Sequence, residues 1–115
     1  AAFLTDMEAH GLADKVLVLM WSEFGRRVEE NGSRGTDHGS AQPMFIAGTR
    51  VKGGLYGAEP SLTDLDNKNL KFSTDFRSVY AGVLRDVVGV TDPSTILGGA
   101  FGPVAVLRAP AAAAA

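Results

Sequence analysis

The spacing of apolar positions predicts one long helix in this chain of 115 residues. Seven apolar side chains from Phe76 to Val88 recur at intervals of three and four, which places them on one helical face. Thr74 or Asp75 is expected to cap the start of this helix, and Gly89 to end it. The same criteria predict two shorter helices, over Phe3–Met7 and Ser94–Leu97.

Uninterrupted apolar runs predict strands of a parallel sheet. Val16–Trp21 is apolar at every position, which is typical of a strand covered on both faces, and Met44–Gly48 is a second short run. Phe101–Leu107 is expected to be extended. Between these segments, Asn31–Ala41 has the glycine-rich composition of a loop and Thr49–Lys71 is rich in turns. Strands covered on both faces belong to parallel sheets, which indicates the α/β class.

The composition of the chain argues against nucleic-acid binding, cysteine chemistry and a membrane span. The chain has 11 basic and 13 acidic residues, a net charge of −2, so we expect no electrostatic hold on nucleic acid. It contains no cysteine, which excludes disulfides, Cys-ligated zinc and thiol nucleophiles. The longest apolar run is far below the roughly 20 residues of a membrane helix, and we expect no membrane span.

One group of residues has the chemistry of a metal site. Asp37 and His38 lie together in the glycine-rich loop, and Glu23 follows the apolar strand, where ligand sites of α/β sheets gather. Imidazole and carboxylate form a mixed nitrogen and oxygen donor set that suits a divalent cation. Arg26 is a candidate for binding an anionic ester. Ordinary alternatives remain: Asp37 as a turn residue, and Arg26 as the partner of Glu30 one helical turn later.

Other polar residues favour structural roles. Asp64 and Asp66 resemble the start of a calcium loop, but Lys68 stands where a third oxygen ligand is needed, so turn chemistry is preferred. His10 is interpreted as a residue at a helix end. Ser22 lacks the glycine context of a nucleophile and is expected to satisfy backbone groups.

Four motifs occur in order: SEFGRR at 22–27, GTDHG at 35–39, GGLYG at 53–57 and TDFRSVY at 74–80. With them, the stretch from about Phe3 to Leu107 resembles the carboxy-terminal part of the bacterial DUF1501 family, which is placed near the alkaline phosphatase and sulfatase superfamily. The resemblance implies that residues 1–109 are the C-terminal portion of one domain, part of a sandwich with a mostly parallel sheet flanked by helices. Residues 110–115 form an alanine-rich tail with no predicted fold.

The resemblance also implies a site. In that superfamily a core strand ends in a metal-binding Asp-His pair, and a later glycine-rich loop supplies another histidine. Glu23 and His38 occupy matching positions, with Asp37 beside them, and the implied ion is zinc, manganese or calcium. Phe24 stands where histidine is expected and has no lone pair to donate, so a single-metal or altered site is the expectation.

The implied function is hydrolysis of a phosphate or sulfate ester by the longer protein. The nucleophile and an upstream metal-binding aspartate would come from an N-terminal part of the domain, so this chain alone is expected to be inactive. The alternative is a non-catalytic binding or structural module. Exposed sheet edges would also favour a homo-oligomer, and the resemblance implies a periplasmic or secreted protein although the chain shows no export signal.

Overall fold

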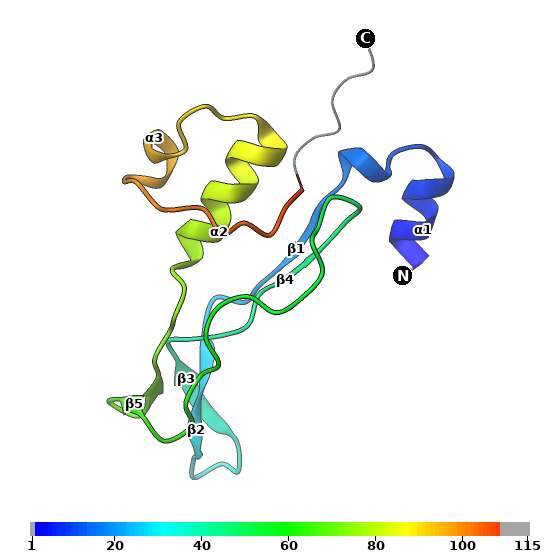
Figure 1. Ribbon diagram of the computed structural model, residues 1–115. Helices are drawn as coiled ribbons and strands as arrows, with labels where there is room; N and C mark the ends of the chain where they lie inside the picture. The colour runs from blue at the N-terminus through cyan, green and yellow to red at the C-terminus, as the bar shows by residue number, and fades with distance from the viewer. Residues whose placement is uncertain (1, 109–115) are drawn as a thin grey trace. The chain divides into compact units, whose positions relative to one another are not determined.

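The computed structural model describes residues 2–108 (Figure 1). Its helical elements are α1 (Ala2–Ala9), η1 (Ala13–Lys15), α2 (Phe76–Val83), η2 (Leu84–Val88) and α3 (Ser94–Leu97). Its strands are β1 (Val18–Met20), β2 (Gly25–Glu30), β3 (Thr36–Gly39), β4 (Phe45–Ala47), β5 (Leu65–Asp66) and β6 (Asn69–Leu70). No helix within this described part is long and apolar enough to cross a bilayer.

The prediction of a mostly parallel sheet flanked by helices is wrong. The strands form three separate two-stranded sheets, β1 with β4, β2 with β3 and β5 with β6. The β2–β3 and β5–β6 pairs are antiparallel. Parallel strands need long crossover connections, whereas β2 and β3 are joined by a short turn and β5 and β6 by two residues. Short connections therefore produce hairpins here.

The chain divides into two compact units. The first holds the described residues up to Val18, those from Ile46 to Tyr56 and those from Asp75 onward. The second holds Leu19–Phe45 and Gly57–Thr74. The helices α1, α2 and α3 belong to the first unit, and the β2–β3 and β5–β6 hairpins belong to the second.

The first unit contains the buried hydrophobic side chains of the described residues. Val79 and Ala81 on α2 are buried, together with Val106 and Leu107 near the end of the described chain. The backbone N–H of Val104 donates to the Ser78 carbonyl at 3.2 Å and so fixes this final segment against α2. Of the seven residues on the predicted apolar face, Val79 alone is buried, whereas Phe76 and Val88 are exposed and the buried Ala81 lies outside that face.

The long helix is confirmed together with both of its ends. Asp75 caps it, because its side chain accepts a hydrogen bond from the Arg77 backbone N–H. The helix α2 continues as η2, which has π-helical hydrogen bonding, and stops at Gly89 with φ 83°. The short helix α3 ends in the same manner, at Gly98 with φ 71°.

The Asp75 carboxyl is expected to titrate well below its ordinary pKa. Side-chain and backbone hydrogen bonds from Arg77 lower the pKa of Asp75 from 3.8 to about 2. Because the folded state prefers the ionised form, this stabilisation is complete above the ordinary value and is lost as pH falls towards about 2. A carboxyl NMR titration should give a midpoint of about 2, rising towards 3.8 in Arg77→Gln. A midpoint near 3.8 in the unsubstituted chain would contradict this cap geometry.

The expectation that Val16–Trp21 is covered on both faces is wrong. Strand β1 forms at its centre, but none of these six side chains is buried. Met20 is 54% exposed and Trp21 is 57% exposed. On the paired strand β4, Phe45 is 58% exposed. Apolar character alone predicts a strand here but does not establish that the described chain covers it.

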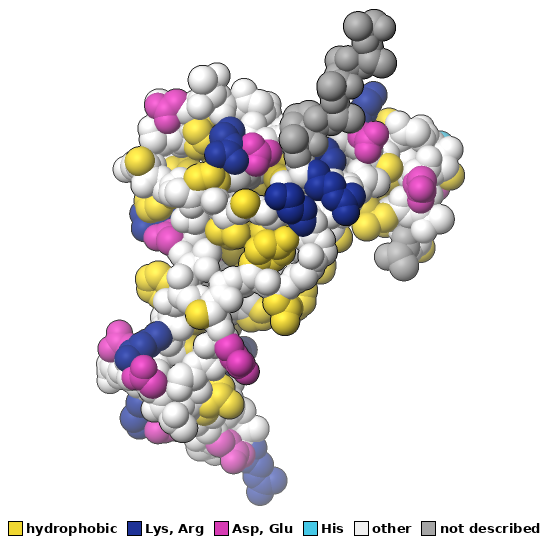
Figure 2. Space-filling model, viewed as in Figure 1, with side chains coloured by type: hydrophobic (Ala, Val, Ile, Leu, Met, Phe, Trp, Pro, Cys, Tyr) yellow, Lys and Arg dark blue, Asp and Glu magenta, His cyan; other side chains and the backbone are white. Residues whose placement is uncertain are grey.

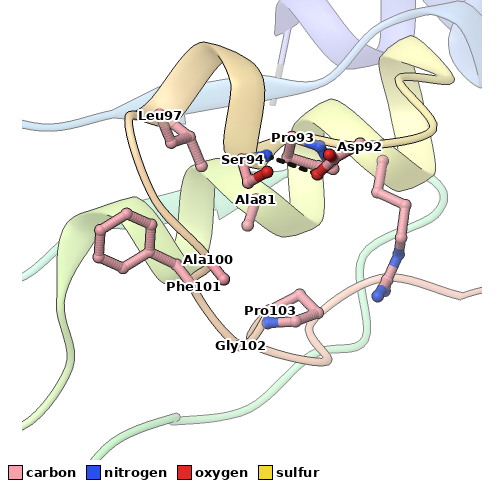
Figure 3. Close-up of a pocket in the computed structure, with 10 residues that line it drawn as sticks. Ala81, Asp92, Pro93, Ser94, Leu97, Ala100, Phe101, Gly102 and Pro103 are labelled. Carbon is pink, nitrogen blue, oxygen red and sulfur yellow. Dashed lines mark hydrogen bonds between the residues drawn. The ribbon is translucent and has the colours of Figure 1, made fainter.

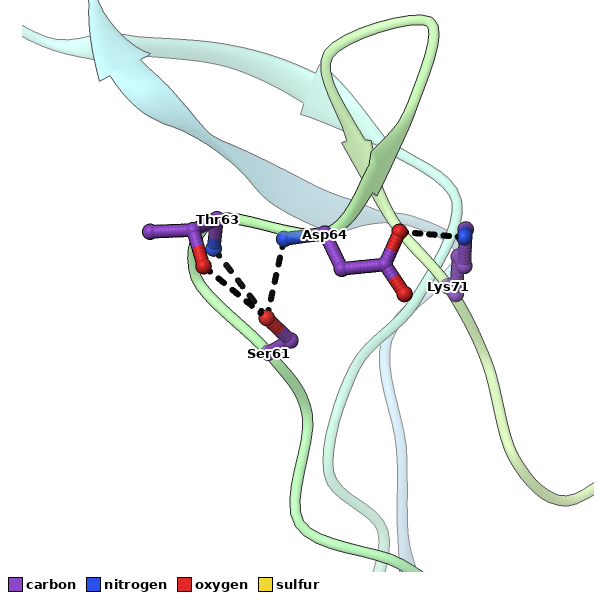
Figure 4. Close-up of polar contacts among 4 residues, drawn as sticks. All are labelled: Ser61, Thr63, Asp64 and Lys71. Atoms are coloured by element: carbon purple, nitrogen blue, oxygen red, sulfur yellow. Dashed lines mark hydrogen bonds and ion pairs between the residues drawn. The ribbon is translucent and has the colours of Figure 1, made fainter.

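Polar contacts hold the second unit together, since no hydrophobic side chain among its described residues is buried. The Ser40 hydroxyl donates to the Leu70 carbonyl at 3.1 Å, and Lys68 pairs with Glu29 at 3.0 Å. Figure 4 shows a further group at the start of β5, where the Ser61 hydroxyl accepts the Asp64 backbone N–H. Surface ion pairs of this kind contribute little each, and the described residues of this unit form no buried hydrophobic core.

Candidate functional site

The β2–β3 hairpin brings two of the predicted site residues together. Its register pairs Gly25 with Gly39 and Arg26 with His38. The glycines are needed because a Cβ on Gly39 would lie 2.8 Å from the Arg26 backbone carbon. The segment 31–41, which was expected to be a loop, contains the strand β3. The close approach of the two backbones places His38 beside Arg26.

The His38 ring is held by an aromatic stack. Its centroid lies 3.6 Å from that of Phe24, with an angle of 15° between the ring planes. The Arg26 guanidinium carbon lies 5.1 Å from the Phe24 centroid, and its Nη1 donates to the Thr36 carbonyl at 2.7 Å. Among residues 2–108, the His10 ring forms a hydrogen bond, whereas the His38 ring forms none. The stack orients the imidazole and leaves its nitrogens unengaged by those residues.

Glu23 lies within the electrostatic reach of His38. Hydrogen bonds from its own backbone and from the Ser22 hydroxyl, which donates to Oε2 at 3.2 Å, lower the pKa of Glu23. The charges of His38 and Arg26 lower this pKa further. Glu23 precedes β2 and His38 lies in β3, and both side chains are exposed. We call Glu23, Phe24, Arg26 and His38 the hairpin cluster.

Asp37 has a different environment. It neighbours His38 in β3, where successive side chains point to opposite faces. Its Oδ1 accepts a hydrogen bond from Asn31 Nδ2 at 3.0 Å. The Asn31 side-chain oxygen in turn accepts the backbone N–H groups of Ser33 and Gly35, both at 3.0 Å. Asp37 therefore lies in β3, and its side chain supports the β2–β3 turn through Asn31, close to the role given by the turn alternative.

The hairpin cluster has donors of the right chemical type for a divalent cation. Neutral imidazole and ionised carboxylate are both common ligands of zinc and manganese. In the described part of the chain, no group of three His, Asp or Glu residues could hold a metal ion. Zinc sites in proteins have three or four protein ligands, so Glu23 and His38 alone would bind zinc weakly.

The remaining polar candidates have local partners. His10 Nδ1 lies 3.4 Å from the Asp6 carboxylate one helical turn earlier. Asp64 forms an ion pair with Lys71 (Figure 4). The Ser22 hydroxyl bonds to Glu23, and its backbone N–H and carbonyl both bond to the Gln42 side chain. These contacts agree with structural roles for all three residues.

A pocket in the first unit lacks free polar groups for catalysis. It encloses about 320 Å³ between α2 and α3 (Figure 3). Its charged lining residues are Arg85, which pairs with Asp86 at 2.7 Å, and Asp92, whose Oδ1 accepts the Ser94 backbone N–H at 3.0 Å. The other lining residues are small or apolar apart from Ser94. Ligand sites usually direct several free polar groups inward, so the hairpin cluster is the stronger candidate.

Two features of the site were not predicted from the sequence. The Phe24–His38 stack depends on the hairpin register, and the Asn31 support of Asp37 depends on the turn that closes it. An asparagine six residues before a loop aspartate is a weak signal, and Thr36–Gly39 has no apolar position whose alternation would indicate a strand.

Comparison with known proteins places the chain in a family. A family model described as "Protein of unknown function (DUF1501)" matches residues 1–88. The chain therefore belongs to the DUF1501 family. No curated protein and no solved structure matches it. The family description assigns no activity, so function has to be argued from the hairpin cluster.

Proposed function

We propose that this chain supplies part of a divalent-metal site, with His38 and Glu23 as two ligands, in a metal-dependent hydrolase of phosphate or sulfate esters. The observation that carries the proposal is the His38 imidazole, fixed by its stack on Phe24 and lying within reach of the Glu23 charge. Metal ligands are commonly oriented by neighbours in this manner. A bound cation would polarise an ester oxygen.

The residues of this chain would bind the metal ion and orient the ester group of the substrate. Arg26 lies opposite His38 in the register, and four of its five N–H donors remain beyond the bond to Thr36. A guanidinium is well suited to the paired oxygens of a phosphate or sulfate. The remaining metal ligands and the nucleophile would come from a part of the domain outside this chain, so we expect no ester hydrolysis by the chain alone.

A second candidate is a non-catalytic binding module. The observation that favours it is Phe24, which packs against His38 instead of donating a lone pair to a metal. In this alternative, the stack and the Arg26 contact stabilise the hairpin, and His38 binds no cation.

Zinc titration calorimetry on the full chain distinguishes these candidates. We expect His38→Ala to weaken zinc binding by at least about tenfold and Glu23→Gln to weaken it less, because a removed ligand lowers affinity more than a weakened one. His10→Ala is the matched control, since it removes the chain's other histidine, and Asp37→Asn tests the residue assigned to the turn. Equal affinities in His38→Ala and His10→Ala would overturn the metal proposal and favour the binding module.

A further inference from the structure

A second cluster of charged residues lies in the first unit, where two distant segments pair. Val51 and Leu107 form an antiparallel bridge. The Lys52 N–H donates to the Val106 carbonyl, and the Arg108 N–H donates to the Arg50 carbonyl, both at 2.8 Å. This pattern places Arg50 directly opposite Arg108. We call residues 50–52 and 106–108 the basic ribbon.

Three cations share one face of the basic ribbon. Side chains directly opposite each other, or two apart on one strand, point to the same side. Arg50, Lys52 and Arg108 meet this condition, and so does the buried Val106 opposite Lys52, while Leu107 projects to the other side and is also buried. Figure 2 shows Lys and Arg side chains gathered on this part of the molecule. Like charges directly opposite each other destabilise a strand pair, so this arrangement favours a bound anion.

The acidic groups of the described residues form no ion pair with these cations, although Asp86 lies within electrostatic range of Arg50 and Lys52. No ion pair within residues 2–108 involves Arg50, Lys52 or Arg108. Asp86 pairs instead with Arg85; that hydrogen bond is the main cause of the lowered pKa of Asp86, and the charges of Arg50 and Lys52 lower it further. Asp14, the other carboxylate near this ribbon, accepts the Thr49 hydroxyl at 3.0 Å.

The guanidinium groups are positioned and only partly used. Arg50 Nη2 donates to the Arg108 carbonyl at 3.1 Å, and Arg108 Nη1 donates to the Thr49 carbonyl at 3.4 Å. These bonds restrain both side chains and leave most of their N–H donors available. The Arg50 Nε, like the Arg27 Nε, is buried with no hydrogen-bond partner. A buried atom is out of reach of a ligand, so the Nη groups of Arg50 and Arg108 would make the contacts.

We infer that the basic ribbon is a binding site for a tetrahedral oxyanion, the phosphate or sulfate group of a ligand. Paired guanidinium groups match the oxygens of such a group. A long polyanion such as a nucleic acid is disfavoured for two reasons. The three cations are confined to a short stretch of the paired segments, and the whole chain carries a net charge of −2. This inference is independent of the metal proposal, since none of these residues belongs to the hairpin cluster.

Titration of the full chain with inorganic phosphate and with sulfate, followed by amide NMR shifts at low ionic strength, tests the inference. We expect saturable shifts at residues 50–52 and 106–108, and affinity about tenfold lower in Arg108→Gln. Arg108 is exposed, so this variant leaves the backbone bridge in place. Arg34→Gln, which removes one exposed positive charge from the other unit, is the control and should bind unchanged.

The two anions distinguish the ligand group. Binding of phosphate alone would show that the site takes a phosphate group, and binding of sulfate alone would show that it takes a sulfate group. Equal binding of both would show that it recognises their shared tetrahedral dianion. Each of these results supports the site. Equal weakening in Arg108→Gln and Arg34→Gln would overturn it by showing nonspecific attraction. Tighter binding of a glutamate-rich peptide than of either anion would also overturn it, in favour of an acidic protein partner.

Discussion

Gly25→Ala is expected to disrupt the β2–β3 hairpin and with it the hairpin cluster. A Cβ at this position would lie 1.6 Å from the Ala41 carbonyl oxygen, and that atom belongs to backbone that cannot rotate away. Overpacking of this kind costs about 3 kcal/mol. NMR of the His38 ring measures the effect, because stacking on Phe24 shifts its proton resonances. We expect this ring-current shift to disappear in the variant.

Gly32→Ala is the control for this substitution. Gly32 lies in the turn of the same hairpin, and nothing lies within 4 Å of a Cβ built there. A substitution at such a surface position is expected to change the free energy of unfolding by no more than about 0.5 kcal/mol. The His38 shift should therefore be retained. Retention of the shift in Gly25→Ala as well would show that the hairpin does not approach Ala41 as described.

Leu107→Ala is expected to destabilise the first unit by about 3 kcal/mol, since removal of a buried leucine leaves a cavity. Leu107 is 6% exposed and is one of four buried hydrophobic residues in the described part of the chain. With so small a core, the loss is a large fraction of the total stability of a domain. Urea unfolding followed by the helical circular dichroism signal measures it, because α1, α2 and α3 all lie in this unit.

Leu55→Ala makes the same chemical change at a fully exposed position of the same unit. Its unfolding midpoint should shift little, in keeping with about 0.5 kcal/mol or less for surface substitutions. Equal destabilisation by the two variants would contradict the assignment of the core to α2 and residues 106–107.

The helices could be predicted from the sequence because their signals are local. Asp75 and Gly89 are a cap and a stop whose effect depends only on nearby backbone. The strand at Val18–Met20 was predictable for the same reason. Sheet topology could not be predicted in this way. An apolar run such as Val16–Trp21 is compatible both with a buried parallel strand and with the exposed strand observed. Partner strands are chosen by connections and tertiary contacts, which composition does not reveal.

The candidate site was chosen from residue chemistry, and its arrangement depends on the fold. The assignment of His38 and Glu23 as ligands stays a prediction, supported by the effect of the His38 charge on the pKa of Glu23. The separation of Asp37 from His38 follows from a strand where a loop was expected. The role of Phe24 as the support of His38 required the hairpin register. Adjacent residues share a site in a loop more readily than in a strand, where their side chains point to opposite faces.

Imidazole NMR of the full chain during zinc titration tests the central claim most directly. We expect zinc to shift the His38 ring resonances and to leave those of His10 in place, because His38 is the proposed ligand. We also expect Glu23→Gln to reduce the His38 response. Equal shifts of both rings, or a response of His10 alone, would contradict a metal site at the β2–β3 hairpin.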